Sequence, residues 1–226
     1  MRCCCLCLLI SLTVPGVQIS AQSSPSRARA SKSGAEIELE PGSVDNGSYR
    51  NKSLKLTCKI PDGWVLRTDE MNTGSQDRTT NDPADSSKPA EAHVSGAEAK
   101  VLLAAFSRPP EAKGEEVNSS ILIAAEPMSA YPGLTDAAQY FGPLNEVAEA
   151  QGFTKDGDPY EVVIGPQMLV RADFHKDVGT RVMRQSTLVM LSSGYAVSIT
   201  MIAGSDDAVG QLLNGLDFQS AARSTK

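Results

Sequence analysis

The chain has 226 residues, of which 41% are hydrophobic and 21% charged, and 27 acidic residues against 21 lysines and arginines leave a formal net charge of −6. This acidic balance argues against a basic nucleic-acid-binding protein, which needs positive charge to neutralise a row of phosphates. With two histidines in the whole sequence, a metal centre built from several histidines is excluded.

The N-terminal segment, residues 1–21, has the pattern of a signal peptide. Arg2 precedes an apolar run over residues 3–14, which is too short to cross a bilayer as a helix, and Ala21 offers a small residue at the expected cleavage point. Removal of this segment leaves Cys58 as the remaining cysteine. No later stretch is long and apolar enough to span a membrane, so we expect a protein that is secreted or periplasmic after cleavage near Ala21.

Three segments have the composition of poorly ordered chain. Residues 22–46 predict a disordered leader, residues 69–97 a disordered loop, and residues 221–226 a C-terminal tail. Arg27, Arg29 and Lys32 form a weak basic cluster in the leader, which is either a solvated tail or a loose tether to an anionic envelope surface. The ordered domain is therefore expected over residues 47–220.

Alternation of apolar and polar residues predicts the strands of this domain. Residues 54–60 alternate as a half-buried strand and place Cys58 on its apolar face, where we expect a buried, inert thiol. Further strands are predicted over residues 100–107, 120–125, 160–164, 168–175, 181–191 and 195–203. The last three are joined by short turns, as in an antiparallel meander.

Two helices accompany these strands. The first is expected to begin at Thr135 and end at Gly152, with Gly142-Pro143 kinking or dividing it, and the second to begin at Ser205. Phe218 is expected to return to the core after the second helix. Strands, a helix, a meander and a closing helix predict an α+β fold, in which an antiparallel β-sheet carries α-helices packed on its faces as an α/β/α sandwich.

Motifs for catalysis, phosphate binding and metal binding are missing from the sequence. There is no nucleophile elbow, and Ser192 and Ser193 fit a hairpin turn. No glycine-rich phosphate loop occurs, and Asp156-Gly157-Asp158 is a fragment of a calcium loop without its remaining ligands. We therefore expect no catalytic, cofactor-binding or metal-binding residues, no cofactor and no enzymatic activity.

One polar cluster has two interpretations. Arg171, Asp173, His175 and Asp177 alternate along a predicted strand, so their side chains share one face. His175 between two carboxylates could act as a general acid or base. The other interpretation is a solvated sheet face with alternating charges.

Short motifs along the chain resemble the PsbP-like superfamily. They are Tyr49-Arg50-Asn51 at the end of a short strand, the apolar strand that follows, Pro61-Asp62-Gly63-Trp64, and Leu216-Asp217-Phe218 at the C-terminal end. This superfamily includes an extrinsic protein of photosystem II and a Ran-binding import factor. The resemblance implies a PsbP-like sandwich in a distant exported member of bacterial type, and proteins of this kind act mainly in binding or assembly. No binding residue of the family matches a defined position here.

These observations together predict an exported, non-enzymatic binding or assembly protein of the cell envelope that acts through protein or surface contacts. Its partner is expected to be a protein or an envelope component, and neither nucleic acid nor a membrane span is expected. The alternative is a small-molecule-binding or hydrolytic domain that uses a groove near His175.

Overall fold

The computed structural model describes residues 39–77, 99–112, 114 and 116–220. The predicted signal peptide, most of the predicted leader, residues 78–97 of the predicted loop and the C-terminal tail lie outside the described residues. In the part of the chain that is described, no helix is long and apolar enough to cross a membrane.

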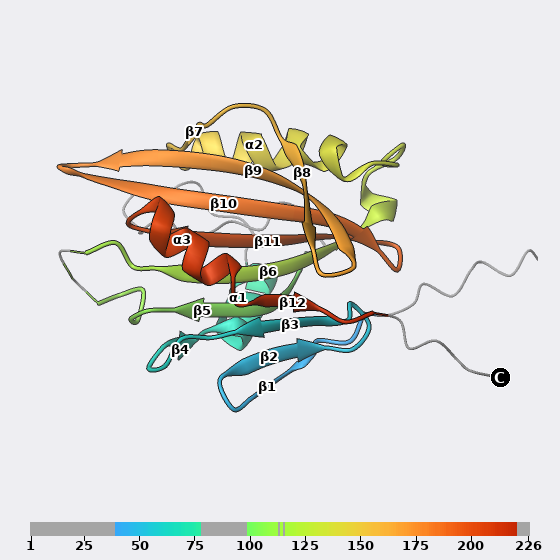
Figure 1. Cartoon of the computed structure of the whole chain (residues 1–226), viewed down its shortest axis with the longest axis horizontal. Coiled ribbons are helices and arrows are strands. Elements are labelled where there is room, and N and C mark those ends of the chain that lie inside the picture. Colours follow the sequence, from blue (N-terminus) through green and yellow to red (C-terminus); the bar gives the residue numbers. More distant parts are fainter. Residues whose placement is uncertain (1–38, 78–98, 113, 115, 221–226) are drawn as a thin grey trace, which may run out of the picture. The chain divides into compact units, whose positions relative to one another are not determined.

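The strands form two sheets, and every strand pair of the described residues is antiparallel (Figure 1). The small sheet has the order β1-β2-β3-β12. The large sheet has the order β4-β5-β6-β11-β10-β9-β7, and β8 also pairs with β9. The bounds are β1 (Ser43–Asp45), β2 (Ser48–Asn51), β3 (Leu56–Lys59), β4 (Val65–Leu66), β5 (Lys100–Phe106), β6 (Ser120–Pro127), β7 (Thr154–Lys155), β8 (Tyr160–Ile164), β9 (Gln167–Val178), β10 (Arg181–Ser192), β11 (Tyr195–Ala203) and β12 (Leu216–Phe218).

Helices occur at three places along the described chain. Helix α1 (Thr68–Asp77) follows β4, and α3 (Asp206–Leu213) precedes β12. Between β6 and β7 lie two 3-10 helices, η1 (Met128–Ala130) and η2 (Ala137–Tyr140), and then α2 (Phe141–Ala150). The Ser205 side chain accepts a hydrogen bond from the Ala208 N–H and caps α3 at the residue where the sequence predicts its start.

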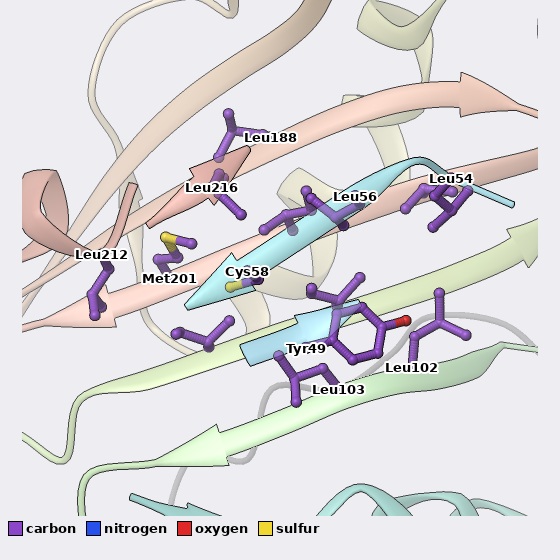
Figure 2. Close-up of a cluster of buried hydrophobic side chains, with 14 of the residues drawn as sticks. Tyr49, Leu54, Leu56, Cys58, Leu102, Leu103, Leu188, Met201, Leu212 and Leu216 are labelled. Carbon is purple, nitrogen blue, oxygen red and sulfur yellow. The ribbon is translucent and has the colours of Figure 1, made fainter. Parts of the chain in front are cut away.

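The larger apolar cluster lies between the two sheets (Figure 2). Tyr49 and Cys58 contribute from the small sheet, Leu103 and Leu188 from the large sheet, and Leu212 from α3. Phe218 is buried in the same cluster, as the sequence predicts. Figure 1 shows why: β12, near the C-terminal end of the chain, lies beside β3.

The opposite face of the large sheet is covered by helices. Tyr140, Phe141 and Ala148, from η2 and α2, pack on Phe174 and Val189 of the long β9–β10 hairpin. A smaller cluster, which includes Met71 of α1, covers part of the face near β5. The predicted α+β class with helices on an antiparallel sheet is thus confirmed. The second sheet, which covers part of one face, was not predicted.

Helix α1 differs from the sequence interpretation at residues 69–77, the described part of the predicted loop 69–97. Its residues up to Asp77 fall in the segment that the composition predicts as a disordered loop. Contacts with β5 account for the helix: the Asn72 side chain accepts from the Val101 N–H at 2.9 Å and donates to the Val101 C=O at 3.0 Å, and the Thr68 hydroxyl accepts from the Ala104 N–H. These are tertiary contacts, and composition does not record them.

The first predicted helix is divided in two, as expected from Gly142-Pro143, but its cap differs by one residue. Asp136, and not Thr135, is the N-cap of η2, where its side chain accepts from the Ala138 N–H and Gln139 completes a capping box. Helix α2 begins at Phe141, which places Pro143 in its first turn. A proline is tolerated there because an N–H in the first turn has no acceptor within the helix.

Cys58 provides a test of the core. It is fully buried, and burial raises the pKa of its thiol to about 12. Because the thiolate is the reactive form, we expect Ellman's reagent at pH 8 to count the same number of thiols in the native wild type and in Cys58→Ala. In denaturant the wild type should show one more. A native count that Cys58→Ala lowers by one would contradict a buried, inert thiol.

Candidate functional site

Asp173 is the centre of the first polar cluster. Arg171 binds its Oδ1 atom through Nε at 2.9 Å and Nη2 at 2.8 Å, and the Tyr160 hydroxyl donates to Oδ2 at 2.8 Å. The Ser186 hydroxyl is a third donor, also to Oδ1. Side chains from β8, β9 and β10 therefore meet on one carboxylate, which ties the short strand β8 to the long hairpin.

His175 belongs to a second cluster on the same face. Its Nδ1 lies 2.6 Å from Oδ1 of Asp156, and the other carboxylate oxygen of Asp156 lies 3.5 Å from Nη1 of Arg184. Nε of Arg184 in turn lies 3.6 Å from Oδ1 of Asp206 at the start of α3. The partner of His175 thus comes from the chain that follows β7, and not from a neighbouring position on β9.

The predicted set of four residues is therefore only partly brought together. Arg171 and Asp173 bind each other, His175 binds Asp156, and Asp177 is exposed near the hairpin tip. Arg171, Asp173 and His175 are half-buried and ion-paired, whereas Asp177 is exposed. A general acid or base acts on a bound substrate or water, and the hydroxyl of Ser186 on this face donates to Asp173.

The calcium-loop fragment and the paired serines have structural roles. Asp156 binds His175 and Arg184, and Asp158 lies 3.2 Å from Nζ of Lys155. Among the described residues there is no cluster of three or more histidine, cysteine or acidic side chains that could hold a metal ion. Ser193 and Gly194, both with positive φ, form the two-residue turn between β10 and β11 that the sequence predicts.

A third cluster was missed by sequence reasoning. Glu126 on β6 is 3% exposed and hydrogen-bonds the hydroxyls of Tyr131 and Tyr140. The two rings meet edge to face, with centroids 5.2 Å apart. Burial raises the pKa of the Glu126 carboxyl, although the tyrosine hydrogen bonds oppose this. A single glutamate at the end of an apolar strand was the available sequence signal.

Sequence reasoning also missed an apolar surface on the β8–β9 hairpin. Val163 is 68% exposed and Met168, its partner across the hairpin, is 58% exposed. Tyr160 at the start of β8 is a third exposed large hydrophobic residue. Tyr160 is opposite Arg171 and its hydroxyl binds Asp173, so its side chain lies on the other face of the hairpin. We call Val163 and Met168, which share one face, the hairpin patch. Large exposed apolar side chains side by side are unusual on a surface that contacts only water.

Comparison with known proteins gives matches among solved structures. No family model matches the chain, and no curated protein matches its sequence. Cyanobacterial PsbP from Synechocystis is 13% identical to this chain, and the match covers 79% of this chain and 96% of that one, with a TM-score of 0.41. The structural relatives thus include a PsbP protein.

Two further solved structures show a similar degree of likeness. LpqN of Mycobacterium tuberculosis, described as involved in cell envelope biogenesis, is 15% identical over 73% of this chain and 83% of that chain, with a TM-score of 0.38. Mog1 is 12% identical over 76% of this chain and 85% of that chain, with a TM-score of 0.37. These are distant likenesses.

Proposed function

We propose that this chain is an exported, non-enzymatic binding or assembly protein of the cell envelope, and that it contacts a protein partner through the hairpin patch. The observation that carries the proposal is the exposure of Val163 and Met168 opposite each other on one face of the β8–β9 hairpin. Neighbouring exposed apolar side chains are typical of interaction surfaces, in which methionine is enriched.

The edge of this hairpin indicates what kind of contact is expected. Strand β8 has five residues, carries the exposed Glu161, and lies between Pro159 and Pro166. Short length, an edge charge and flanking prolines all oppose the addition of another strand. We therefore expect the partner to bind the side chains of the hairpin patch and not to extend the sheet.

The hydrolytic or small-molecule-binding alternative near His175 has one observation in its favour, the His175–Asp156 pair. Such a pair can orient an imidazole as a general base. The supporting groups on this face are already bound to one another, since Asp173 binds Arg171, Tyr160 and Ser186. Because these polar groups already bind one another, this face fits a binding protein better than an enzyme.

Crosslinking in intact cells followed by mass spectrometry tests the proposal. We expect the wild-type chain to give a reproducible crosslinked partner, and Val163→Glu with Met168→Glu to lower its yield at least about tenfold, because two charges at an apolar contact oppose desolvation. Val178→Glu is the matched control, since Val178 is exposed on the β9–β10 hairpin outside the patch. An equal yield from all three chains would count against the patch as the binding surface.

A further inference from the structure

The outward face of the small sheet carries a second surface, of different chemistry. Tyr49 on β2 and Cys58 on β3 are opposite one another in the register and point inward, so Arg50 and Lys59 point outward. Lys52 and Lys55 lie in the turn between the two strands. All four side chains are exposed. We call Arg50, Lys52, Lys55 and Lys59 the basic face.

The charges of the basic face are not neutralised by ion pairs within the described residues. No acidic side chain of that part of the chain lies within salt-bridge distance of any of the four. Elsewhere in the described chain, Arg181 alone has neither an ion pair nor a hydrogen bond from its side chain to a backbone carbonyl. The other basic residues bind a carboxylate or a backbone carbonyl: Arg67, Lys100, Arg108, Lys155, Arg171, Lys176 and Arg184.

Four exposed carboxylates lie around this face, and none forms an ion pair with it. Asp45 is opposite Ser48, which is itself opposite Lys59, and Asp217 is opposite Thr57, which is opposite Arg50. Each of these two is thus two strands away from the nearest basic residue of its row. Glu40 precedes the small sheet, and Asp62 follows β3. Cations and anions are thus equal in number here, whereas acidic residues exceed basic ones in the chain as a whole.

Both ends of the described chain meet at this surface. The Asn51 side chain donates to the Glu40 carbonyl at 2.8 Å, and the Gln219 N–H donates to the Lys55 carbonyl at 2.9 Å. The sequence beyond these points adds Arg27, Arg29 and Lys32 before the domain, along with Glu36 and Glu38, and Arg223 and Lys226 after it. The segments that carry most of the remaining terminal positive charge are therefore attached next to the basic face.

The composition of the face favours a lipid surface over a protein partner. Its other outward residues are small and polar, such as Ser48 and Thr57. A protein interface needs buried aromatic or large apolar anchors, and these lie on the hairpin patch instead. A plane of anionic headgroups needs only several basic side chains that reach it together.

We propose that the basic face docks the protein on a membrane surface rich in anionic phospholipid. This inference deepens the proposed function, since it rests on export to the cell envelope and names the second component that the protein contacts there. The hairpin patch then remains available for the protein partner. Lipid binding and partner binding depend on different residues, so each can fail without the other.

Co-sedimentation with lipid vesicles tests this proposal. The full chain is mixed with phosphatidylcholine vesicles, with or without phosphatidylglycerol, and binding to the anionic vesicles is compared with binding to the neutral ones. Each basic residue close to an anionic surface strengthens binding about fivefold. We therefore expect Lys52→Gln with Lys55→Gln to weaken binding to the anionic vesicles at least about tenfold, and added salt to weaken binding of the wild type.

Two further variants separate charge at this face from charge in general. Arg181→Gln is the matched control, because Arg181 is exposed, has no ion pair among the described residues and lies at the tip of the β9–β10 hairpin. It should bind as the wild type does. Asp217→Asn removes a carboxylate from the small sheet and should strengthen binding to the anionic vesicles but not to the neutral ones, whereas misfolding would raise sedimentation with both.

Three outcomes would overturn the proposal. They are equal binding to neutral and anionic vesicles, an equal loss in Arg181→Gln and in the lysine variant, and no loss in the lysine variant. If the partner of this face were an acidic protein, vesicle binding would be absent while the lysine variant lost a crosslinked protein in cells. The crosslinks of the hairpin patch should persist in every variant of the basic face.

Discussion

Replacing Asn51 with alanine is expected to lower the free energy of unfolding by about 3 kcal/mol. The Asn51 side chain is buried, donates to the Glu40 carbonyl and the Tyr49 hydroxyl, and accepts from the Leu54 N–H at 3.0 Å. Alanine leaves the Glu40 carbonyl and the Leu54 N–H without these partners, whereas the Tyr49 hydroxyl still donates to the Pro41 carbonyl. Each unsatisfied buried group costs about 1–3 kcal/mol. Such a loss is a large part of the stability of an ordinary domain.

Urea unfolding followed by tryptophan fluorescence or circular dichroism measures this effect. The matched control is Asn214→Ala, because Asn214 is exposed at the end of α3 and its side chain makes no hydrogen bond within the described residues. It should change the free energy of unfolding by less than about 0.5 kcal/mol. If Asn51→Ala changed the free energy of unfolding as little as the control does, the hydrogen bonds of the buried amide would not stabilise the packing of residues 40–54.

Asn51 also explains part of the sequence resemblance. The strand that ends in Tyr49-Arg50-Asn51 is one of the motifs, and the structure gives a physical reason for its asparagine. The Asn51 side chain hydrogen-bonds the Glu40 carbonyl before β1, the Tyr49 hydroxyl, and the Leu54 N–H in the turn before β3. A carboxamide combines two N–H donors with a carbonyl acceptor, which this position requires. The motif therefore marks a packing constraint of the fold and not a binding residue.

The long strands were predictable because their local patterns are strong. Strands β9 to β11 show alternation or continuous apolar runs, and their two-residue turns carry Gly179 or Gly194 with positive φ. Strands β1, β4 and β7 have two or three residues each, which is too short to show a period. Strand β12 is defined by pairing with β3, and no local pattern specifies a partner so distant in sequence.

The candidate sites were predictable only along single strands. Alternation along the strand placed Arg171, Asp173 and His175 on one face, and in the structure these residues alternate with buried ones along β9 and share that face. It could not show that Asp156 is the partner of His175, because that contact depends on the pairing of β7 with β9. Nor could it reveal the cluster around Glu126, because Tyr131 follows η1 and Tyr140 ends η2, and neither position shows a period shared with β6.

Glu126 should make the stability of the protein depend on pH in an unusual direction for a glutamate. Burial raises the pKa of its carboxyl above the ordinary glutamate value of 4.5 in the folded state, whereas in the unfolded chain the pKa is ordinary. The folded state therefore holds the proton more tightly. As pH rises from about 4.5 through the folded-state pKa, the folded state loses stability, and above that pKa the full cost of a buried carboxylate is present.

Two tyrosines define the environment of this carboxylate. The hydroxyls of Tyr131 and Tyr140 bind it, and no basic side chain contributes to the shift of its pKa. The carboxylate in turn raises the pKa of Tyr131, which burial and this contact bring to about 12, and it raises the pKa of Tyr140 further. Neither tyrosine should ionise in the range where Glu126 titrates, so the pH dependence of this cluster is assigned to the carboxyl group.

Glu126→Gln should remove this pH dependence. The wild type should become less stable relative to the variant as pH rises from 4 to 8, because the folded state binds the proton of Glu126 more tightly than the unfolded chain does. The buried amide of the variant has its own hydrogen-bonding cost, but that cost does not change with pH. The result is therefore the change with pH of the difference in free energy of unfolding between the two proteins.

Urea unfolding from pH 4 to 8 measures this difference. Glu146→Gln, on the exposed side of α2, is the matched control and should follow the wild type at every pH. A constant difference between Glu126→Gln and the wild type from pH 4 to 8 would show that Glu126 has an ordinary pKa in the folded protein.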